Sequence, residues 1–131
     1  MLPLFASLLI GAQSLRTDYP TEILKNQITS LPGLDAATLK KYTMFSGYID
    51  VYPAHNRSLF YWFVESLNDP TNDPVALWTN GGPGCSGLGG FFTEQGPFRP
   101  KSDLQLYVNN YSWVNVANML FIEAPAGVGF S

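Results

Sequence analysis

Two segments near the middle of the chain have the pattern of paired β-strands. Residues 42–52 read YTMFSGYIDVY and residues 57–66 read RSLFYWFVES. Aromatic and β-branched residues favour strands, and the short PAHN stretch between the two segments favours a turn. We therefore expect an antiparallel hairpin, with Gly47 marking a bulge in its first strand.

Two later runs, VALW at Val75–Trp78 and ANMLFIEAP at residues 117–125, are short and mainly apolar. Such runs are typical of strands that are buried on both faces. Between them, a glycine-rich turn leads into residues 85–94, which are expected to form a short helix that ends at the GPFRP segment. Residues 104–109 (LQLYVN) are expected to form an edge strand or an extended loop.

This order of elements predicts an α/β fold whose sheet carries an antiparallel edge hairpin. Two buried strands and one short helix cannot cover both faces of such a sheet. The domain expected over residues 42–131 is therefore the beginning of a larger fold, and residues 15–41, which are polar and mixed, form a lead-in or propeptide-like segment.

The N-terminus reads MLPLFASLLIGAQS, and its apolar stretch is too short to span a bilayer. Ala12 and Ser14 are placed as the small residues of a signal-peptidase site, although a basic n-region is missing. We expect residues 1–14 to be a signal peptide; the alternative is a buried or membrane-associated helix. Two N-x-S sequons, at Asn56 and Asn110, support a secretory address that leads outside the cell or to a vacuole or lysosome.

Cys85 is the single cysteine of the 131 residues. In an oxidising compartment it should be either a free thiol or half of a disulfide whose partner lies outside this sequence.

Charged residues make up only 13% of the chain, while apolar residues make up 46%. So small a share of charged residues indicates either that a partner buries much of the surface or that the chain is part of a larger protein. The net charge is -3 and no basic run extends beyond Lys40-Lys41, which argues against nucleic-acid and anionic-membrane partners.

The stretch ALWTNGGPGCSG places four glycines and a proline directly after an apolar run. Residues 82–87 fit the dinucleotide pattern G-x-G-x-x-G, but Asp103 precedes an extended segment instead of ending a strand, where a ribose-binding acid belongs. A second interpretation is an oxyanion hole, whose backbone N–H donors glycine leaves accessible. A third is a turn that only permits tight packing. Ser86 is not a nucleophile elbow, because Leu88 stands where G-x-S-x-G needs glycine.

The longer stretch LWTNGGPGCSGLGGFFTEQGPFRP closely resembles the signature of the serine carboxypeptidase family. This is an α/β-hydrolase family of secreted, vacuolar and lysosomal exopeptidases. The flanking segments FSGYIDV, LFYWFVES and NNYSWVNVANMLFIEAPAGVGFS resemble the family's neighbouring strands, so the resemblance covers residues 46–131. It implies an incomplete α/β-hydrolase fold.

The resemblance implies roles for particular positions. Gly82 resembles the glycine whose backbone N–H forms half of the oxyanion hole, and Gly81 helps to shape the same turn. Asn80 and Glu94 resemble two residues that hold the carboxylate of a peptide's C-terminus, and Trp78 resembles the tryptophan that supports them. The alternatives are that Asn80 is only a turn residue, Glu94 a helix-end residue and Trp78 part of the core.

Two further expectations concern neighbouring residues. Cys85 resembles a disulfide cysteine whose partner lies far downstream. Because no Lys or Arg stands close to Asn80 and Glu94 in the sequence, the expected partners of a bound carboxylate are neutral donors. His55, the single histidine, is expected to lie on the surface of the hairpin turn.

The function that the resemblance implies is serine-type carboxypeptidase activity on peptide C-termini, with no cofactor and no metal. The family's Gly-Glu-Ser-Tyr-Ala-Gly-type elbow does not occur in these 131 residues, so this chain alone is expected to be inactive. The alternatives are a carboxypeptidase-like acyltransferase, which shares the scaffold, and a non-catalytic truncated remnant.

Overall fold

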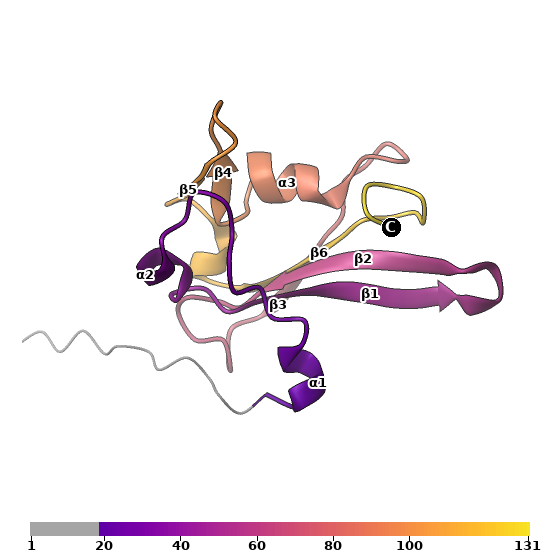
Figure 1. The fold of residues 1–131 in the computed structure, drawn as a ribbon, viewed down its shortest axis with the longest axis horizontal. Helices are drawn as coiled ribbons and strands as arrows, with labels where there is room; N and C mark the ends of the chain where they lie inside the picture. Colours follow the sequence, from indigo (N-terminus) through magenta and orange to yellow (C-terminus); the bar gives the residue numbers. More distant parts are fainter. Residues whose placement is uncertain (1–18) are drawn as a thin grey trace, which may run out of the picture.

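The computed structural model describes residues 19–131, so the expected signal peptide lies outside the described residues. The longest elements are the strands β1 and β2 and the helix α3, with the short strand β3 between β2 and α3 along the chain (Figure 1). The helices and strands are α1 (Thr21–Leu24), α2 (Ala36–Leu39), β1 (Met44–Tyr52), η1 (Pro53–His55), β2 (Arg57–Val64), β3 (Val75–Trp78), α3 (Gly87–Thr93), β4 (Phe98–Pro100), β5 (Leu106–Val108), η2 (Trp113–Asn115) and β6 (Asn118–Ile122).

Within residues 19–131, the main sheet has the strand order β1-β2-β6-β3. β1 and β2 form the expected antiparallel hairpin, and β2 also pairs with β6 in antiparallel fashion. β3 and β6 are parallel, with α3 between them in the sequence. The mixed sheet with an antiparallel edge hairpin confirms the predicted fold class.

The bulge of the hairpin does not lie at Gly47, and that prediction was wrong. Gly47 pairs in regular register with Tyr61, whereas the register shifts between Asp50 and Tyr52, next to the turn. A Cβ atom on Gly47 would lie 3.1 Å from the ring of Tyr61. The glycine therefore gives room to a cross-strand aromatic ring instead of bending the strand.

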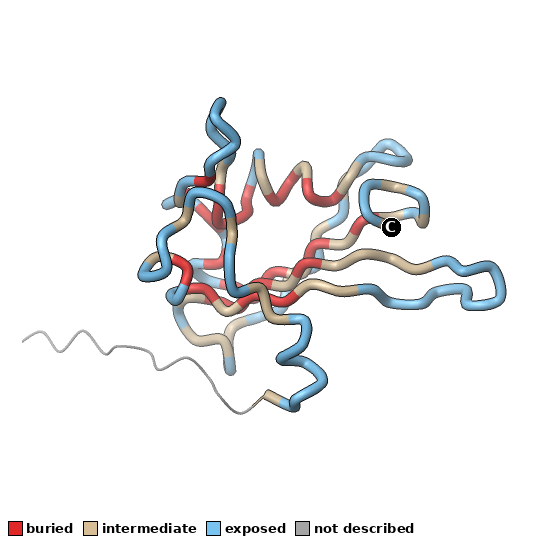
Figure 2. Tube along the Cα trace, in the orientation of Figure 1, coloured by how far each residue is buried: buried red, intermediate tan, exposed pale blue. Residues whose placement is uncertain are grey.

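Helix α3 covers one face of the sheet, and the core lies between them (Figure 2). Trp62 of β2 packs against Phe91 of α3, with ring centroids 4.4 Å apart. Phe91 also makes an edge-to-face contact with Phe121 of β6 at 5.0 Å. Every second residue of each strand contributes to this core, because successive side chains of a β-strand point to opposite faces of the sheet.

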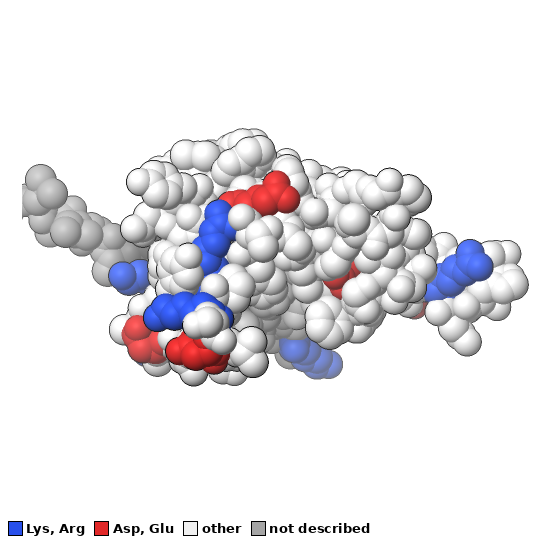
Figure 3. Space-filling view, turned by 90° about the horizontal axis from the view of Figure 1, so that it is seen from above, with Lys and Arg blue, Asp and Glu red and all other residues white. Residues whose placement is uncertain are grey.

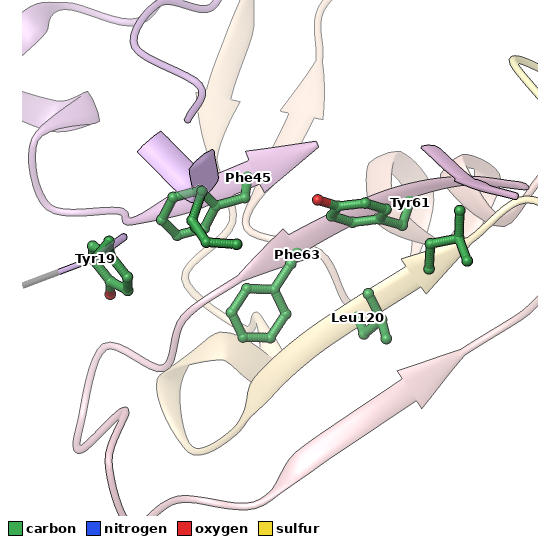
Figure 4. Close-up of a pocket in the computed structure, with 7 residues that line it drawn as sticks. Tyr19, Phe45, Tyr61, Phe63 and Leu120 are labelled. Atoms are coloured by element: carbon green, nitrogen blue, oxygen red, sulfur yellow. The ribbon is translucent and has the colours of Figure 1, made fainter. Parts of the chain in front are cut away.

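The opposite face of the sheet is apolar as well, and it holds a pocket of about 310 Å³ (Figure 4). Phe45 of β1, Phe63 of β2 and Leu120 of β6 line this pocket, and Tyr19 reaches it from the N-terminal segment. The same segment pairs with the outer edge of β1 through a bridge between Gln27 and Phe45. Residues that precede β1 therefore cover part of one sheet edge.

Strand β3 forms the other edge of the sheet and is not buried on both faces, which corrects the sequence prediction. Val75 is 65% exposed and Leu77 is 60% exposed, and in the described part of the chain no strand pairs with the outer edge of β3. An apolar run that is buried in the complete fold of a larger protein has the same sequence pattern as one that is buried within these residues. The pattern alone could not distinguish them.

Three smaller regions complete the fold. The expected helix at residues 85–94 is shorter, at Gly87–Thr93, and Ser86 caps its N-terminus. β5 pairs with β4, a strand that the sequence pattern did not predict.

In the loop before β3, the Ser66 hydroxyl donates a hydrogen bond to the Asp73 carboxylate and thereby lowers the pKa of Asp73 below its ordinary value.

The surface is sparsely charged, and the view in Figure 3 shows only scattered basic and acidic side chains. None of the helices between residues 19 and 131 has the length and hydropathy needed to cross a bilayer.

The exposed apolar edge leads to a prediction for residues 19–131 expressed alone. Large uncovered apolar patches favour association over a unique monomeric state. We expect no cooperative urea transition in near-ultraviolet circular dichroism, and strong binding of a hydrophobic dye. Replacing Val75 and Leu77 with threonine should reduce dye binding. A single cooperative transition with a slope appropriate to this length would contradict the prediction.

Candidate functional site

The glycine turn lies at the carboxyl end of β3, where the chain crosses to α3. Gly81 and Gly82 are both exposed, so their backbone groups are accessible to a ligand. Gly82 has φ of 127°, a conformation that residues with a Cβ atom rarely adopt. The Cys85 N–H donates to the Gly81 carbonyl at 3.2 Å and closes the turn. The turn can present backbone donors without the steric cost that any other residue would carry at position 82.

Trp78 and Asn80 are joined by a hydrogen bond across the end of β3. The Trp78 Nε1–H donates to Asn80 Oδ1 at 2.9 Å, and the Gly90 N–H of α3 donates to the same oxygen at 3.3 Å. The indole of Trp78 also makes an edge-to-face contact with Trp113, at 6.1 Å between ring centroids. The Asn80 oxygen is thus held by two donors, and within residues 19–131 its amide Nδ2 donates to no other group.

Gly90 permits this arrangement because it has no side chain. A Cβ atom there would lie 2.2 Å from Trp78 Nε1, far inside van der Waals contact. At the neighbouring Gly89 a Cβ atom would lie 3.6 Å from Asn80 Nδ2, an ordinary contact. The requirement for glycine at position 90 is therefore specific to the tryptophan, and sequence reasoning missed it.

Glu94 is the C-terminal cap residue of α3, and it is exposed. Its backbone N–H donates to the Gly90 carbonyl, so it lies one helical turn beyond the glycine that contacts Asn80. The helix thus carries Glu94 and supports Asn80. A cation that the sequence reasoning did not place here does lie near Glu94, because Arg99 Nη2 donates to the Glu94 carbonyl oxygen. That a bound carboxylate would meet neutral donors stays a prediction.

A second acidic residue, Glu123, was not identified from the sequence. It follows β6 directly and is 1% exposed. The Ser86 hydroxyl donates to Glu123 Oε1, and the Phe130 N–H donates to Oε2. A charged residue directly after the apolar run MLFI was the signal in the sequence that could have revealed it.

The other candidate residues lie apart from this group. Cys85 is an exposed free thiol, as the single cysteine of the chain. Both sequon asparagines, Asn56 and Asn110, are exposed. His55 lies on the surface of the hairpin turn and packs against Tyr52, with ring centroids 4.4 Å apart.

The dinucleotide interpretation of the glycine turn finds no support in the geometry. Asp103 accepts a hydrogen bond from the Gln105 N–H in the exposed loop between β4 and β5, so it ends no strand. The part of the chain that the structure describes holds no group of three or more His, Cys, Asp or Glu side chains suited to a metal ion.

Comparisons with known proteins agree on one family. A family model described as serine carboxypeptidase matches residues 32–131. The chain is 46% identical over 130 residues to lysosomal protective protein of Mus musculus. The aligned region covers 98% of this chain and 26% of that protein. The chain is 47% identical over 111 residues to serine carboxypeptidase 1 of Hordeum vulgare, covering 80% of this chain and 22% of that protein.

Among solved structures, a prohormone-processing carboxypeptidase from Saccharomyces cerevisiae matches with a TM-score of 0.70 and 34% sequence identity. The match covers 83% of this chain and 25% of that chain. The sheet and α3 are thus a partial α/β-hydrolase fold. The chain spans about a quarter of the length of the relatives that it matches.

The contact between Gly90 and Trp78 can be tested in a chimera, in which residues 32–131 replace their counterpart in the Hordeum vulgare protein. Gly90→Ala should displace the indole, break its bond to Asn80 and destabilise the protein by about 1–3 kcal/mol. Thermal unfolding and tryptophan fluorescence measure the two effects.

Gly89→Ala is the matched control for this experiment. It adds the same methyl group one residue away without a clash, and alanine stabilises a helix by up to about 1 kcal/mol over glycine. Equal losses of stability in the two variants would refute the specific role of Gly90.

Proposed function

Because the chain belongs to the serine carboxypeptidase family, we propose that it forms part of a serine-type carboxypeptidase that releases C-terminal residues from peptides. Asn80 and Glu94 would supply the clamp for the substrate's terminal carboxylate, and the Gly82 N–H would supply one donor of the oxyanion hole. The family's nucleophile, base and orienting acid would come from outside the sequence described here. No cofactor or metal ion is needed for this chemistry.

The observation that carries the proposal is the fixed orientation of Asn80. With Oδ1 held by Trp78 and Gly90, the amide Nδ2 is the part of the side chain that remains to bind a ligand. An amide NH₂ group donates at every pH, and a carboxylate only accepts. The Trp78–Asn80–Gly90 unit thus presents a donor suited to a peptide's terminal carboxylate.

Glu94 is proposed as the second residue of the clamp, on the same helix that supports Asn80. It can donate to a carboxylate only in its protonated form, because an ionised carboxyl group accepts and repels a like charge. Arg99, which donates to the Glu94 backbone carbonyl, adds a positive charge close to this position. The clamp would therefore combine neutral donors with one nearby cation.

Gly82 is proposed to donate its backbone N–H to the oxygen that becomes negative during acyl transfer. Its exposure and its positive φ support this role, since the donor must face the reacting carbonyl with no side chain in the way. Gly81 would support the same turn by accepting from Cys85. A secretory route to the outside of the cell, a vacuole or a lysosome fits the exposed sequons at Asn56 and Asn110.

The clamp predicts a selective loss of activity in the chimera. Asn80→Ala should cost about 1–3 kcal/mol in kcat/KM on peptides with a free C-terminus, because the carboxylate loses its donor. Peptides with an amidated C-terminus and simple esters should be much less affected. Glu94→Gln, which keeps a donor in nearly the same shape, should retain most activity on free-acid peptides.

Asn72→Ala serves as the control, because Asn72 lies in an exposed loop and hydrogen-bonds to Asp69 alone. It should change neither substrate class. Equal losses on free-acid and amidated substrates in Asn80→Ala would show that the residue serves only the structure of the turn. Ester transfer without peptide hydrolysis in the unmodified chimera would favour the acyltransferase alternative.

Cys85 gives a separate prediction. It is exposed and has no partner cysteine in the chain, so a disulfide requires a cysteine elsewhere in the mature protein. In the chimera, secreted from a eukaryotic cell, Cys85 should resist thiol labelling under denaturing, non-reducing conditions and label after reduction. Rapid labelling before reduction would contradict the assignment.

A further inference from the structure

The carboxylate of Glu123 joins two turns that are far apart in the sequence. On one side it accepts from the hydroxyl of Ser86, at the end of the glycine turn. On the other side it accepts from the Phe130 N–H, in the turn that follows β6. Figure 1 shows the two turns side by side above the sheet, with the turn after β6 in yellow.

Ser86 links the Glu123 carboxylate to helix α3 through two hydrogen bonds. While its hydroxyl hydrogen points to Glu123, its oxygen accepts from the Leu88 N–H at 3.2 Å and caps the helix. The next residue, Gly87, lies so close to β6 that a Cβ atom would be 2.2 Å from the Ile122 carbonyl oxygen. The start of α3, and with it the end of the glycine turn, is therefore fixed directly against the end of β6.

The turn after β6 is built around the same carboxylate. A Cβ atom on Gly129 would lie 2.1 Å from Glu123 Oε1, so only glycine leaves room for the side chain. The Ser131 hydroxyl donates to the Glu123 carbonyl at 2.7 Å and accepts from the Phe60 N–H of β2 at 2.7 Å. Both partners of the buried carboxylate are neutral donors, and both belong to turns.

We infer that Glu123 is a positioning residue, which acts through Ser86 to hold the glycine turn and the Gly82 N–H in place. This inference rests on the proposed function, because it concerns the donor assigned there to the oxyanion hole. A donor displaced by a fraction of an ångström stabilises the developing charge less, while binding of the substrate's carboxylate by Asn80 is little changed. The expected effect is therefore on kcat and not on KM.

The chain contains a matched control for this arrangement at the opposite end of β3. Ser66 also donates its hydroxyl hydrogen to a carboxylate, that of Asp73, and accepts from a backbone N–H two residues on, that of Asn68. Ser66→Ala thus removes the same atoms and the same pair of hydrogen bonds as Ser86→Ala, but away from the glycine turn.

The experiment compares these variants in the chimera, with kcat expressed per active site titrated by a covalent serine-directed inhibitor. Ser86→Ala should lower kcat on a free-acid peptide about tenfold, below the 10²- to 10³-fold loss that follows removal of an oxyanion donor. Ser86→Thr, which keeps the hydroxyl, should restore most of kcat. Glu123→Gln should lower kcat by a smaller factor, since one of its two acceptor oxygens becomes a donor.

The double variant tests whether Glu123 acts through Ser86. Ser86→Ala combined with Glu123→Gln should have the same kcat as Ser86→Ala alone, whereas independent roles would multiply the two losses. An unchanged kcat in Ser86→Ala, multiplied losses in the double variant, or an equal loss in Ser66→Ala would each overturn the inference.

Hydrogen exchange of the peptide that covers residues 79–87 decides the question independently of activity. Ser86→Ala and Glu123→Gln should speed exchange in this peptide, and Ser66→Ala should not. Unchanged exchange in the first two variants would overturn the positioning role. An inactive unmodified chimera with the expected exchange pattern would instead refute the proposed function and leave the positioning of the turn established.

Discussion

The close approach of helix α3 to the ends of β3 and β6 is the constraint on which the site depends. Two glycines make it possible: a Cβ atom at Gly87 would meet the Ile122 carbonyl at 2.2 Å, and one at Gly90 would meet Trp78 Nε1 at 2.2 Å. With the helix this close, its Gly90 N–H reaches Asn80. Protein interiors transmit such contacts because they are close-packed, so a methyl group at either glycine must displace a strand end or an indole ring.

This constraint gives the glycines of the turn after β3 and those of α3 different tasks. Gly82 is needed for its positive φ, Gly87 and Gly90 for close approach, and Gly89 for neither. A pattern of glycines alone left open a nucleotide loop, an oxyanion turn and tight packing, of which the nucleotide loop was the weakest. The geometry shows tight packing at some positions and an exposed backbone at others, so the third interpretation holds and the second stays a proposal.

The hairpin, the two later strands and the short helix could be predicted because each has a local signal: aromatic alternation, an apolar run, and a glycine turn before a helix. The partners in space could not. Nothing local shows that Arg99 folds back onto Glu94, that Glu123 receives Ser86, or that the apolar strand β3 leaves Val75 and Leu77 exposed. The roles of Asn80 and Glu94 came from the family resemblance, while the hydrogen bonds that orient Asn80 came from the structure.

The proposed carboxylate clamp depends on Asn80, which Trp78 and α3 orient so that its amide can bind a peptide's terminal carboxylate. A crystal structure of the chimera with a bound free-acid dipeptide product tests this most directly. We expect a carboxylate oxygen about 3 Å from Asn80 Nδ2, with the Trp78–Asn80 hydrogen bond intact and the Glu94 side chain facing the same group. A carboxylate bound to the Arg99 guanidinium, with Asn80 making no contact to the ligand, would contradict it.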